Sequence, residues 1–210
     1  MQRLESGPPD PIPLTEDAPL RKSRYPYKGK KISFVDTEQY DRILVENLFQ
    51  RPGLPVTILR YPAVYGPNDY HRFGQWVQAM DRGETELKVQ EDFRAWRWTH
   101  GFAENVAEAV ALAATDPRAA GRIYNVGESQ TPTWTERIGE IGHAAGWRAR
   151  VVPVAASRLP EEERMSFDFN HDLVMDTSRI RAELGYTERV SRADTLARTI
   201  ERERSSAAKT

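Results

Sequence analysis

Tyr40 and Arg42 come closest, by residue type and spacing, to a proton-transfer pair in this sequence. A tyrosine hydroxyl can give or take a proton, and a nearby cation stabilises the negative charge left on its oxygen. The surrounding pattern predicts a helix over 37–49, capped by Asp36 or Thr37. Residues two apart on a helix are separated by about 200°, so Tyr40 should point away from Arg42. Periodicity groups Tyr40 with the apolar side chains of this helix, which are Ile43, Leu44 and Leu48.

Glu38, Arg42 and Glu46 occupy the other face of this predicted helix, because residues four apart lie one above the other. Such a face is typical of solvated ion pairs, each worth about 0.3–0.5 kcal/mol. Arg42 can bind a ribose or a phosphate, but it cannot carry a proton. Glu38 is a poor proton donor, because carboxyl groups are already ionised near neutral pH. If a local insertion shifts the register of this helix, the proton-donating tyrosine is instead Tyr40 itself, Tyr25, Tyr27 or Tyr65.

A strand over 54–60, with a tight exit loop behind it, should position a second set of candidates. Val56, Ile58 and Leu59 form an apolar run typical of a buried parallel strand. In an open α/β sheet, ligands bind at the carboxyl ends of the strands, where such a loop lies. Further patterns predict helices over 71–81, 102–115, 133–145, 176–185 and 191–204, and strands over 86–90, 122–126 and 150–154. This alternation indicates an α/β fold with a mainly parallel sheet.

Composition excludes several classes of function. With 30 Lys+Arg against 31 Asp+Glu, the chain has no general attraction to nucleic acid or to an anionic membrane surface. It has no cysteine, which excludes disulfides and thiolate chemistry and is typical of a cytoplasmic protein. The polar segment 168–172 lacks the glycine and glutamate of a calcium loop and the second histidine of a zinc site, so we expect no metal.

Five segments resemble, in colinear order, motifs of the NAD(P)-dependent epimerase/dehydratase family, the extended and atypical short-chain dehydrogenases. They are the proline-rich segment 11–20, Arg60–Pro67 (similar to R-x-x-x-V-Y-G-P), the segment 96–107, the Y-N-V-G element at 123–128, and the closing segment 176–185. The resemblance implies the C-terminal part of a Rossmann-type parallel sheet with a small α/β substrate-binding lobe. It assigns 1–35 to an irregular proline-rich segment, 36–70 and 102–126 to a remnant of the dinucleotide-binding domain, 71–101 and 127–204 to the substrate lobe and C-terminal helix, and 205–210 to a tail.

The same resemblance implies an oxidoreductase or isomerase that uses NAD or NADP on a nucleotide sugar or a similar small carbonyl or alcohol. The family's catalytic tyrosine and lysine lie four residues apart, where this chain has Glu38 and Arg42, so the dyad is not intact. Arg42 would lie near the nicotinamide ribose. The loop facing the nicotinamide corresponds to Tyr61, Pro62, Val64 and Tyr65. The substrate-binding positions correspond to Arg97, at a diphosphate or other anion, His100 and Asn125.

The Gly-rich turn that holds the dinucleotide phosphates in this family is not found in the sequence. Such a turn follows a strand and opens a helix, but Gly139 and Gly142 lie inside a predicted helix and Gly146 fits its C-cap. The resemblance therefore implies that about 100 residues are absent before the catalytic helix. We expect the 210 residues to be inactive alone and to expose an apolar face that favours a homodimer through the 37–49 helix. The alternative is a non-catalytic truncated homologue that acts as a binding or regulatory module.

Overall fold

The computed structural model describes residues 8–29, 36–67, 73–164 and 168–207. Within these ranges the strands form three pairs, and each pair is parallel. The pairs are β1 (Ile58–Arg60) with β5 (Ile123–Asn125), β2 (Ala63–Tyr65) with β4 (His100–Phe102), and β3 (Glu86–Gln90) with β6 (Arg150–Val154). The predicted α/β class and its parallel pairing are confirmed.

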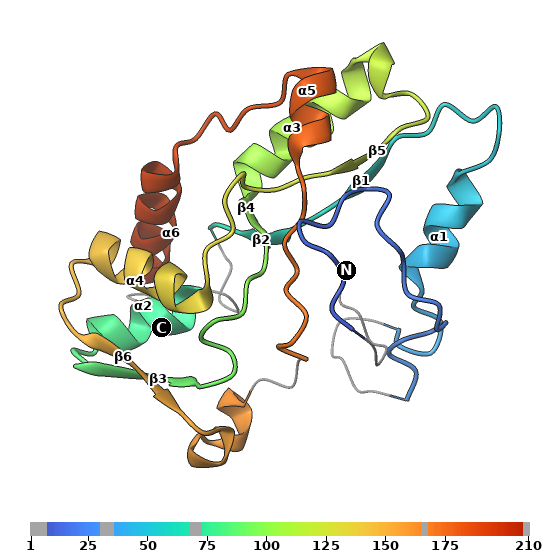
Figure 1. Ribbon diagram of the computed structural model, residues 1–210. Helices are drawn as coiled ribbons and strands as arrows, with labels where there is room; N and C mark the ends of the chain where they lie inside the picture. The colour runs from blue at the N-terminus through green and yellow to red at the C-terminus, as the bar shows by residue number, and fades with distance from the viewer. Residues whose placement is uncertain (1–7, 30–35, 68–72, 165–167, 208–210) are drawn as a thin grey trace.

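Helices connect and flank these strands (Figure 1). They are α1 (Arg42–Phe49), α2 (Gln75–Asp81), α3 (Ala103–Thr115), α4 (Trp134–Ala145), α5 (Ser178–Leu184) and α6 (Arg192–Ala207). Short-range signals fix several of their ends. Thr133 and Glu136 form a reciprocal capping box at the start of α4. Gly146 and Gly185 end α4 and α5 in the left-handed region, with φ of 75° and 72°.

Some boundaries differ from the prediction. The strand expected over 54–60 is formed only at its end, and α6 continues three residues past the predicted Arg204. β2 and β4 were not predicted, because each has three residues and gains its hydrogen bonds from a partner far away in the sequence. The expected irregular segment 1–35 and helix 71–81 fall partly outside the described residues. Within 8–29, the chain makes an isolated β-bridge from Leu14 to Met175.

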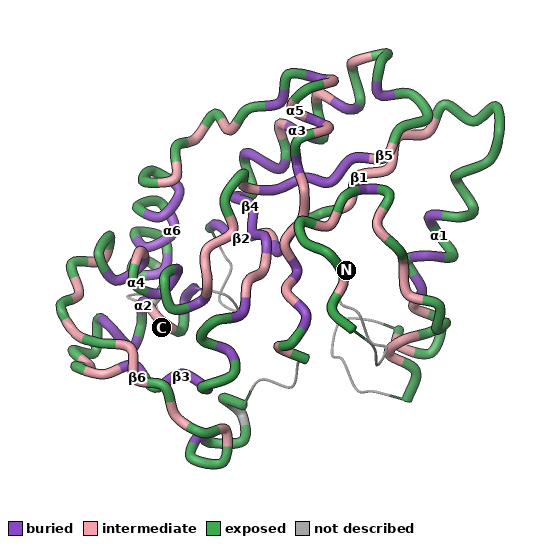
Figure 2. Tube along the Cα trace, viewed as in Figure 1, coloured by how far each residue is buried: buried purple, intermediate pink, exposed green. Residues whose placement is uncertain are grey.

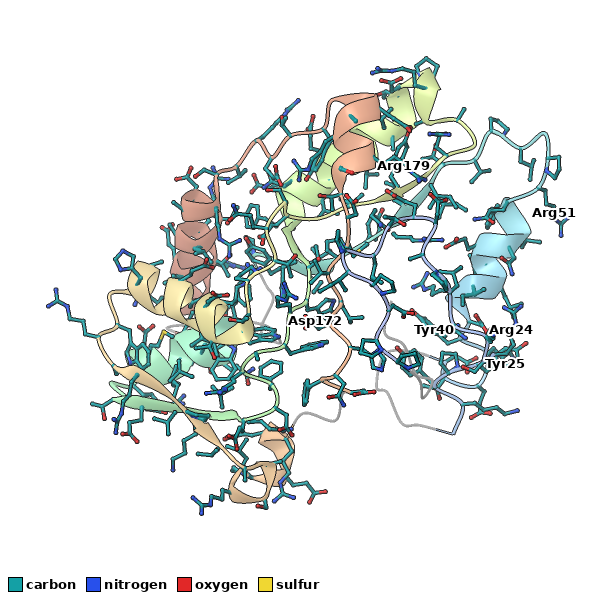
Figure 3. All side chains as sticks on the ribbon, in the orientation of Figure 1. Arg24, Tyr25, Tyr40, Arg51, Asp172 and Arg179 are labelled. Atoms are coloured by element: carbon teal, nitrogen blue, oxygen red, sulfur yellow. The ribbon has the colours of Figure 1, made fainter. Side chains whose placement is uncertain are left out.

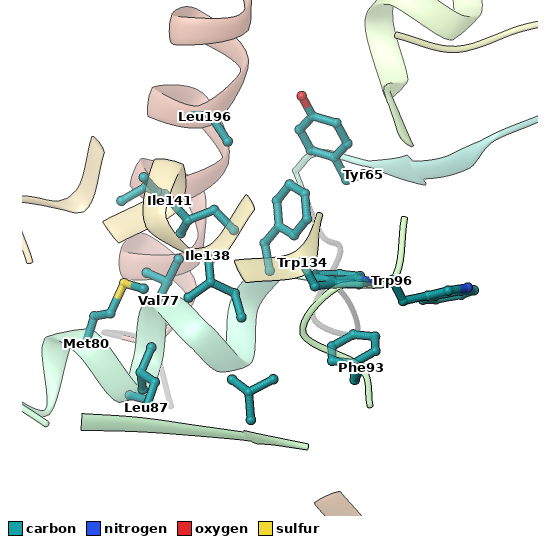
Figure 4. Close-up of a cluster of buried hydrophobic side chains, with 14 of the residues drawn as sticks. Tyr65, Val77, Met80, Leu87, Phe93, Trp96, Trp134, Ile138, Ile141 and Leu196 are labelled. Atoms are coloured by element: carbon teal, nitrogen blue, oxygen red, sulfur yellow. The ribbon is translucent and has the colours of Figure 1, made fainter. Parts of the chain in front are cut away.

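Two apolar cores lie on different sides of the molecule. The larger is built by α2, α4, α6, β3 and the aromatic segment after β3 (Figure 4). It includes Val77, Met80, Leu87, Phe93, Trp96, Trp134, Ile138, Ile141 and Leu196. The smaller is built by α3, α5 and β5, and includes Val106, Ala109, Tyr124, Ile180 and Leu184. Helix α1 stands apart from the larger core, at the opposite side of the view in Figure 1.

Helix α1 differs most from its prediction. It begins at Arg42 rather than Thr37, because the Asp41 carboxylate accepts hydrogen bonds from the main-chain N–H groups of Ile43 and Leu44, at 3.0 and 3.3 Å. Its predicted buried face is confirmed at Ile43 but is wrong at Leu44 and Leu48. Glu46 is buried against Arg60 of β1, whereas the exposed side chains are Leu44, Val45, Leu48 and Phe49. A partner distant in sequence thus draws Glu46 inward, whereas Arg42 stays exposed.

Candidate functional site

The start of α1 brings Tyr40 and Arg42 together. Tyr40 lies in the chain before the helix, so the separation of two residues on a helix does not apply, and the predicted helical placement is wrong. The Arg42 Nε donates to the Tyr40 hydroxyl at 2.8 Å, and its guanidinium lies 5.0 Å from the ring centroid. The ring of Tyr27 meets that of Tyr40 edge-on, with centroids 5.6 Å apart. Burial, followed by the neighbouring Tyr40, raises the pKa of Tyr27.

The Asp41 carboxylate holds this constellation in place. It accepts a 2.6 Å hydrogen bond from Arg21 and a 3.0 Å hydrogen bond from the main chain of Tyr25, in addition to capping α1. Burial alone would raise the pKa of Asp41, but these donors lower it to about 2. Tyr25 adopts a left-handed backbone with φ of 49°, which is uncommon outside glycine. Figure 3 shows Tyr25 and Tyr40 at the lower end of α1.

Glu38 does not join Arg42 and Glu46 on a helix face. It precedes α1, and its carboxylate accepts a hydrogen bond from the main-chain N–H of Gly29 at 3.0 Å. Glu46 is committed to Arg60, whose Nη1 also donates to the carbonyl of Glu16. The ion-pair ladder predicted for these three residues is therefore not formed.

Four residues of the exit loop after β1 were predicted to contact a ligand, and one of them is exposed to solvent. Tyr61 is 53% exposed, Pro62 is buried and Val64 is half-buried. Tyr65 is 1% exposed, and its hydroxyl donates to Glu128 at 2.7 Å and lies 2.8 Å from the Thr195 hydroxyl. Burial first, then the Glu128 charge, raises the pKa of Tyr65. In this structure Tyr65 ties the loop to α6.

Glu128 is the centre of a buried polar network that the sequence analysis missed. Its carboxylate accepts hydrogen bonds from Arg137 of α4 at 2.9 Å and from Arg192 of α6 at 2.7 Å. Arg137 lies three residues after Trp134 and four before Ile141, so helical spacing already placed it on the apolar face. Its acidic partner could not be identified from the sequence, because Glu128 lies on a loop outside any periodic element.

Of the three predicted substrate-binding residues, Arg97 is open to solvent, with 38% of its side chain exposed. His100 is 1% exposed, donates from Nδ1 to the Trp98 carbonyl at 2.6 Å and stacks on Phe73. Asn125 is 2% exposed and links the end of β5 to the N-terminal segment and to the segment before α5. Its side-chain amide donates to the carbonyls of Leu14 and Asp176 at 2.9 and 3.1 Å.

The described residues do not fit the phosphates of a dinucleotide. Gly142 faces Trp147 inside α4, where an added Cβ would lie 2.8 Å from the indole, and Gly146 is a helix C-cap. Within the described ranges, no strand leads into a helix through a Gly-rich turn. We therefore derive no hydride-transfer step for this chain.

The described part of the chain holds neither a metal cluster nor a membrane-spanning helix. His171 lies 3.3 Å from Asp168, but no group of three or more acidic, histidine or cysteine side chains gathers there to hold a metal ion. None of the described helices is both long and apolar enough to cross a membrane.

Known proteins resemble this chain over most of its length. A dTDP-glucose 4,6-dehydratase of Streptomyces griseus is 27% identical over 188 residues, which are 89% of this chain and 52% of that protein. The crystal structure of DesIV, a dTDP-glucose 4,6-dehydratase from Streptomyces venezuelae with NAD bound, matches with a TM-score of 0.65 and 26% identity, covering 99% of this chain and 58% of the other.

A UDP-glucose 4-epimerase from Thermotoga maritima, solved with UDP-glucose, has a TM-score of 0.58 and 21% identity over 79% of this chain and 51% of its own, and so shares the fold. The chain spans about half the length of the curated relatives it matches. The model of the NAD dependent epimerase/dehydratase family matches residues 5–127, which is more than half of the sequence. The chain belongs to the NAD dependent epimerase/dehydratase family.

Proposed function

We propose that this chain is the nucleotide-sugar-binding half of an epimerase or dehydratase and does not catalyse the reaction alone. One observation carries the proposal: Arg97 is half-exposed beside a well-packed lobe, next to the start of α4. A planar guanidinium with five N–H donors suits a diphosphate. The relatives named for dTDP-glucose, and the epimerase solved with UDP-glucose, support this class of ligand.

We further propose that oxidation of the sugar needs polypeptide beyond these residues, to supply the Gly-rich turn for the dinucleotide phosphates. In the completed site, Tyr40 would transfer a proton. The N–H that Arg42 donates to the phenolic oxygen would stabilise the charge developing there. Tyr61 would remain available to a ligand, because its ring is exposed at the end of β1.

Titration calorimetry with UDP-glucose, dTDP-glucose and NAD tests this proposal on the chain as it is. The expected result is binding of a sugar nucleotide and none of NAD. Arg97→Gln should weaken sugar-nucleotide binding at least about tenfold, the effect of losing one charged hydrogen-bonding partner. Arg118→Gln is the matched control, because Arg118 is also exposed and paired with an aspartate. Equal affinities of the two variants, or no binding by the wild type, would overturn the proposal.

A second candidate function is a binding or regulatory module without catalysis, and one observation favours it. The segment Leu14–Glu16 lies across the carboxyl ends of β1 and β5, where ligands of open α/β sheets bind. The Glu16 carboxylate accepts a 2.9 Å hydrogen bond from the main chain of Asn125, and its carbonyl accepts one from Arg60 at 2.7 Å. Sugar-nucleotide binding without any turnover, even after a polypeptide with the proposed Gly-rich turn is added, would favour this function.

The exposed apolar face of α1 supports a third element of the proposal, a homodimer. This face is defined by Leu44, Val45, Leu48 and Phe49, whose exposed fractions run from 39% to 50%. Contiguous apolar patches of this kind are typical of contact surfaces between proteins. We propose that two copies pack through α1.

A further inference from the structure

Arg97 is already neutralised in this structure. Its Nε donates to Asp172 Oδ2 at 2.8 Å, and its Nη2 lies 2.8 Å from the same oxygen. The other carboxylate oxygen, Oδ1, accepts a hydrogen bond from the main-chain N–H of Arg97 at 2.9 Å. One carboxylate therefore engages the guanidinium and the backbone of the same residue. An anion that approaches Arg97 meets a formal negative charge in contact with its binding group.

The main chain holds Asp172 at this place. Leu173 donates to the Arg97 carbonyl at 2.8 Å, and its own carbonyl accepts from Thr99 at 3.0 Å. Met175 donates to the Thr99 hydroxyl at 2.8 Å. Segment 172–175 is therefore fixed along 97–99, and the carboxylate can leave the guanidinium by rotation of its side chain alone. Figure 3 shows Asp172 between the lobe and the N-terminal segment.

A second carboxylate near Arg97, that of Glu136, is held by hydrogen bonds to Thr133. Glu136 accepts hydrogen bonds from the main chain and the hydroxyl of Thr133, at 2.8 and 2.9 Å. These bonds, from the main chain first, lower the pKa of Glu136, and the Arg97 charge adds a smaller effect in the same direction. Since Glu136 is held by the capping box of α4, Asp172 is the direct competitor for the guanidinium.

We propose that Asp172 is a built-in competitor that sets the affinity of Arg97 for the diphosphate of a nucleotide sugar. This inference rests on the proposed function, because it takes Arg97 as the anion-binding residue. Binding of the ligand exchanges the Arg97–Asp172 pair for an Arg97–phosphate pair and turns the carboxylate toward solvent. The binding free energy then includes the difference between the Arg97–phosphate and Arg97–Asp172 interactions. Affinity for the ligand should therefore rise when the charge of Asp172 is removed.

Asp172→Asn tests this inference. Asparagine keeps the shape and the oxygen that accepts from the Arg97 main chain, but it removes the charge that occupies the guanidinium. We expect UDP-glucose and inorganic pyrophosphate to bind this variant about tenfold more tightly than the wild type, the effect of one nearby charge in a half-exposed site. Titration calorimetry at constant ionic strength gives both affinities, and a thermal melt of each variant checks that it is folded.

Asp116→Asn is the matched control. Asp116 pairs with Arg118 in the same way, through the arginine main-chain N–H at 2.9 Å and through Nε at 3.0 Å. It should therefore report the effect of one charge change that is unrelated to the site. Tighter binding by Asp172→Asn than by a wild type that itself binds, with the affinity of Asp116→Asn unchanged, supports the inference.

Unchanged or weaker binding by Asp172→Asn, with measurable binding by the wild type, overturns the inference and leaves the proposed function standing. Absence of binding by the wild type, Asp172→Asn and Asp116→Asn alike overturns both. If Asp172→Asn melts well below the wild type, an NMR titration of the wild type with pyrophosphate replaces it. The Arg97 Nε–H signal should then shift as its partner changes, and an unshifted signal at saturation would contradict the proposal.

Discussion

The lobe built around the larger apolar core and the α1 region use apolar side chains in opposite ways. In α4 of the lobe, Trp134, Ile138 and Ile141 are at most 5% exposed, whereas Leu48 and Phe49 of α1 are 50% and 45% exposed. Figure 2 shows buried segments in both cores, for example along α6 and β5, whereas most of α1 is exposed. The lobe finds its packing partners within this chain. The described residues leave the apolar face of α1 exposed.

Truncation of one buried and one exposed side chain should give the largest difference in stability between the two regions. Ile138→Ala should lower the free energy of unfolding by about 2–4 kcal/mol, because it leaves a cavity in a packed core. Leu48→Ala should change it by less than about 0.5 kcal/mol, since the side chain is half-exposed. Urea denaturation measures both values. Equal losses would show that α1 is packed as tightly as the lobe.

Removal of the Glu128 charge, at the centre of the buried network, should have the next largest effect on the free energy of unfolding. Glu128→Gln leaves Arg137, with 2% of its side chain exposed, without its anionic partner and should destabilise the lobe by about 2 kcal/mol. Glu84→Gln is the control, because the Arg82–Glu84 pair is exposed and contributes about 0–1 kcal/mol. The same denaturation experiment compares the two variants, and equal effects would mean that the network adds no stability.

Acid should loosen the α1 region through Asp41. The folded-state pKa of Asp41, about 2, lies below the value of about 3.9 for an unfolded aspartate. The stability that it contributes is therefore present above pH ~4 and is lost as the pH falls through about 2. Asp41→Asn keeps a helix-capping residue but removes this pH dependence. Hydrogen exchange of 36–49 at several pH values measures it, and an identical acid response of the variant would contradict the assignment to Asp41.

A charge placed on the apolar face of α1 should have the smallest effect on stability but should change the oligomeric state. Leu48→Glu places a charge in the exposed apolar face of α1, so it should convert a dimer to a monomer with little change in the melting temperature. Size-exclusion chromatography with light scattering measures the mass, and Lys88→Glu on the exposed side of β3 is a control for charge. A wild type that stays monomeric at high concentration would show that α1 does not pair with a second copy.

Local signals allowed much of the fold to be predicted. The helix predicted over 133–145 is found at Trp134–Ala145 with Thr133 as its N-cap, and the predicted C-cap at Gly146 is confirmed, because capping depends on neighbouring residues alone. The start of α1 was wrong, because Asp36, Thr37 and Asp41 all satisfy the same capping preference. The inward face of α1 depends on Arg60, a partner 14 residues away, and no periodicity within the helix contains that information.

The candidate site was predictable only in part, for the same reason. Arg97 was selected from a motif and is half-exposed, and its role in ligand binding stays a prediction. Its pairing with Asp172 joins residues 75 positions apart, and the segment 168–172 carried no signal of it. The contact between Tyr40 and Arg42 was missed because the error in the helix start carried over into the geometry of the pair.

Hydrogen exchange with and without ligand tests the central claim most directly, that the lobe is a self-sufficient ligand-binding unit and the α1 region is not. The account predicts slow exchange in α4, α6 and the β3–β6 pair, and fast exchange in α1. It also predicts that dTDP-glucose protects amides of 97–99 and 172–175, whereas NAD changes none. Uniform protection across the chain, or protection by NAD alone, would contradict the account.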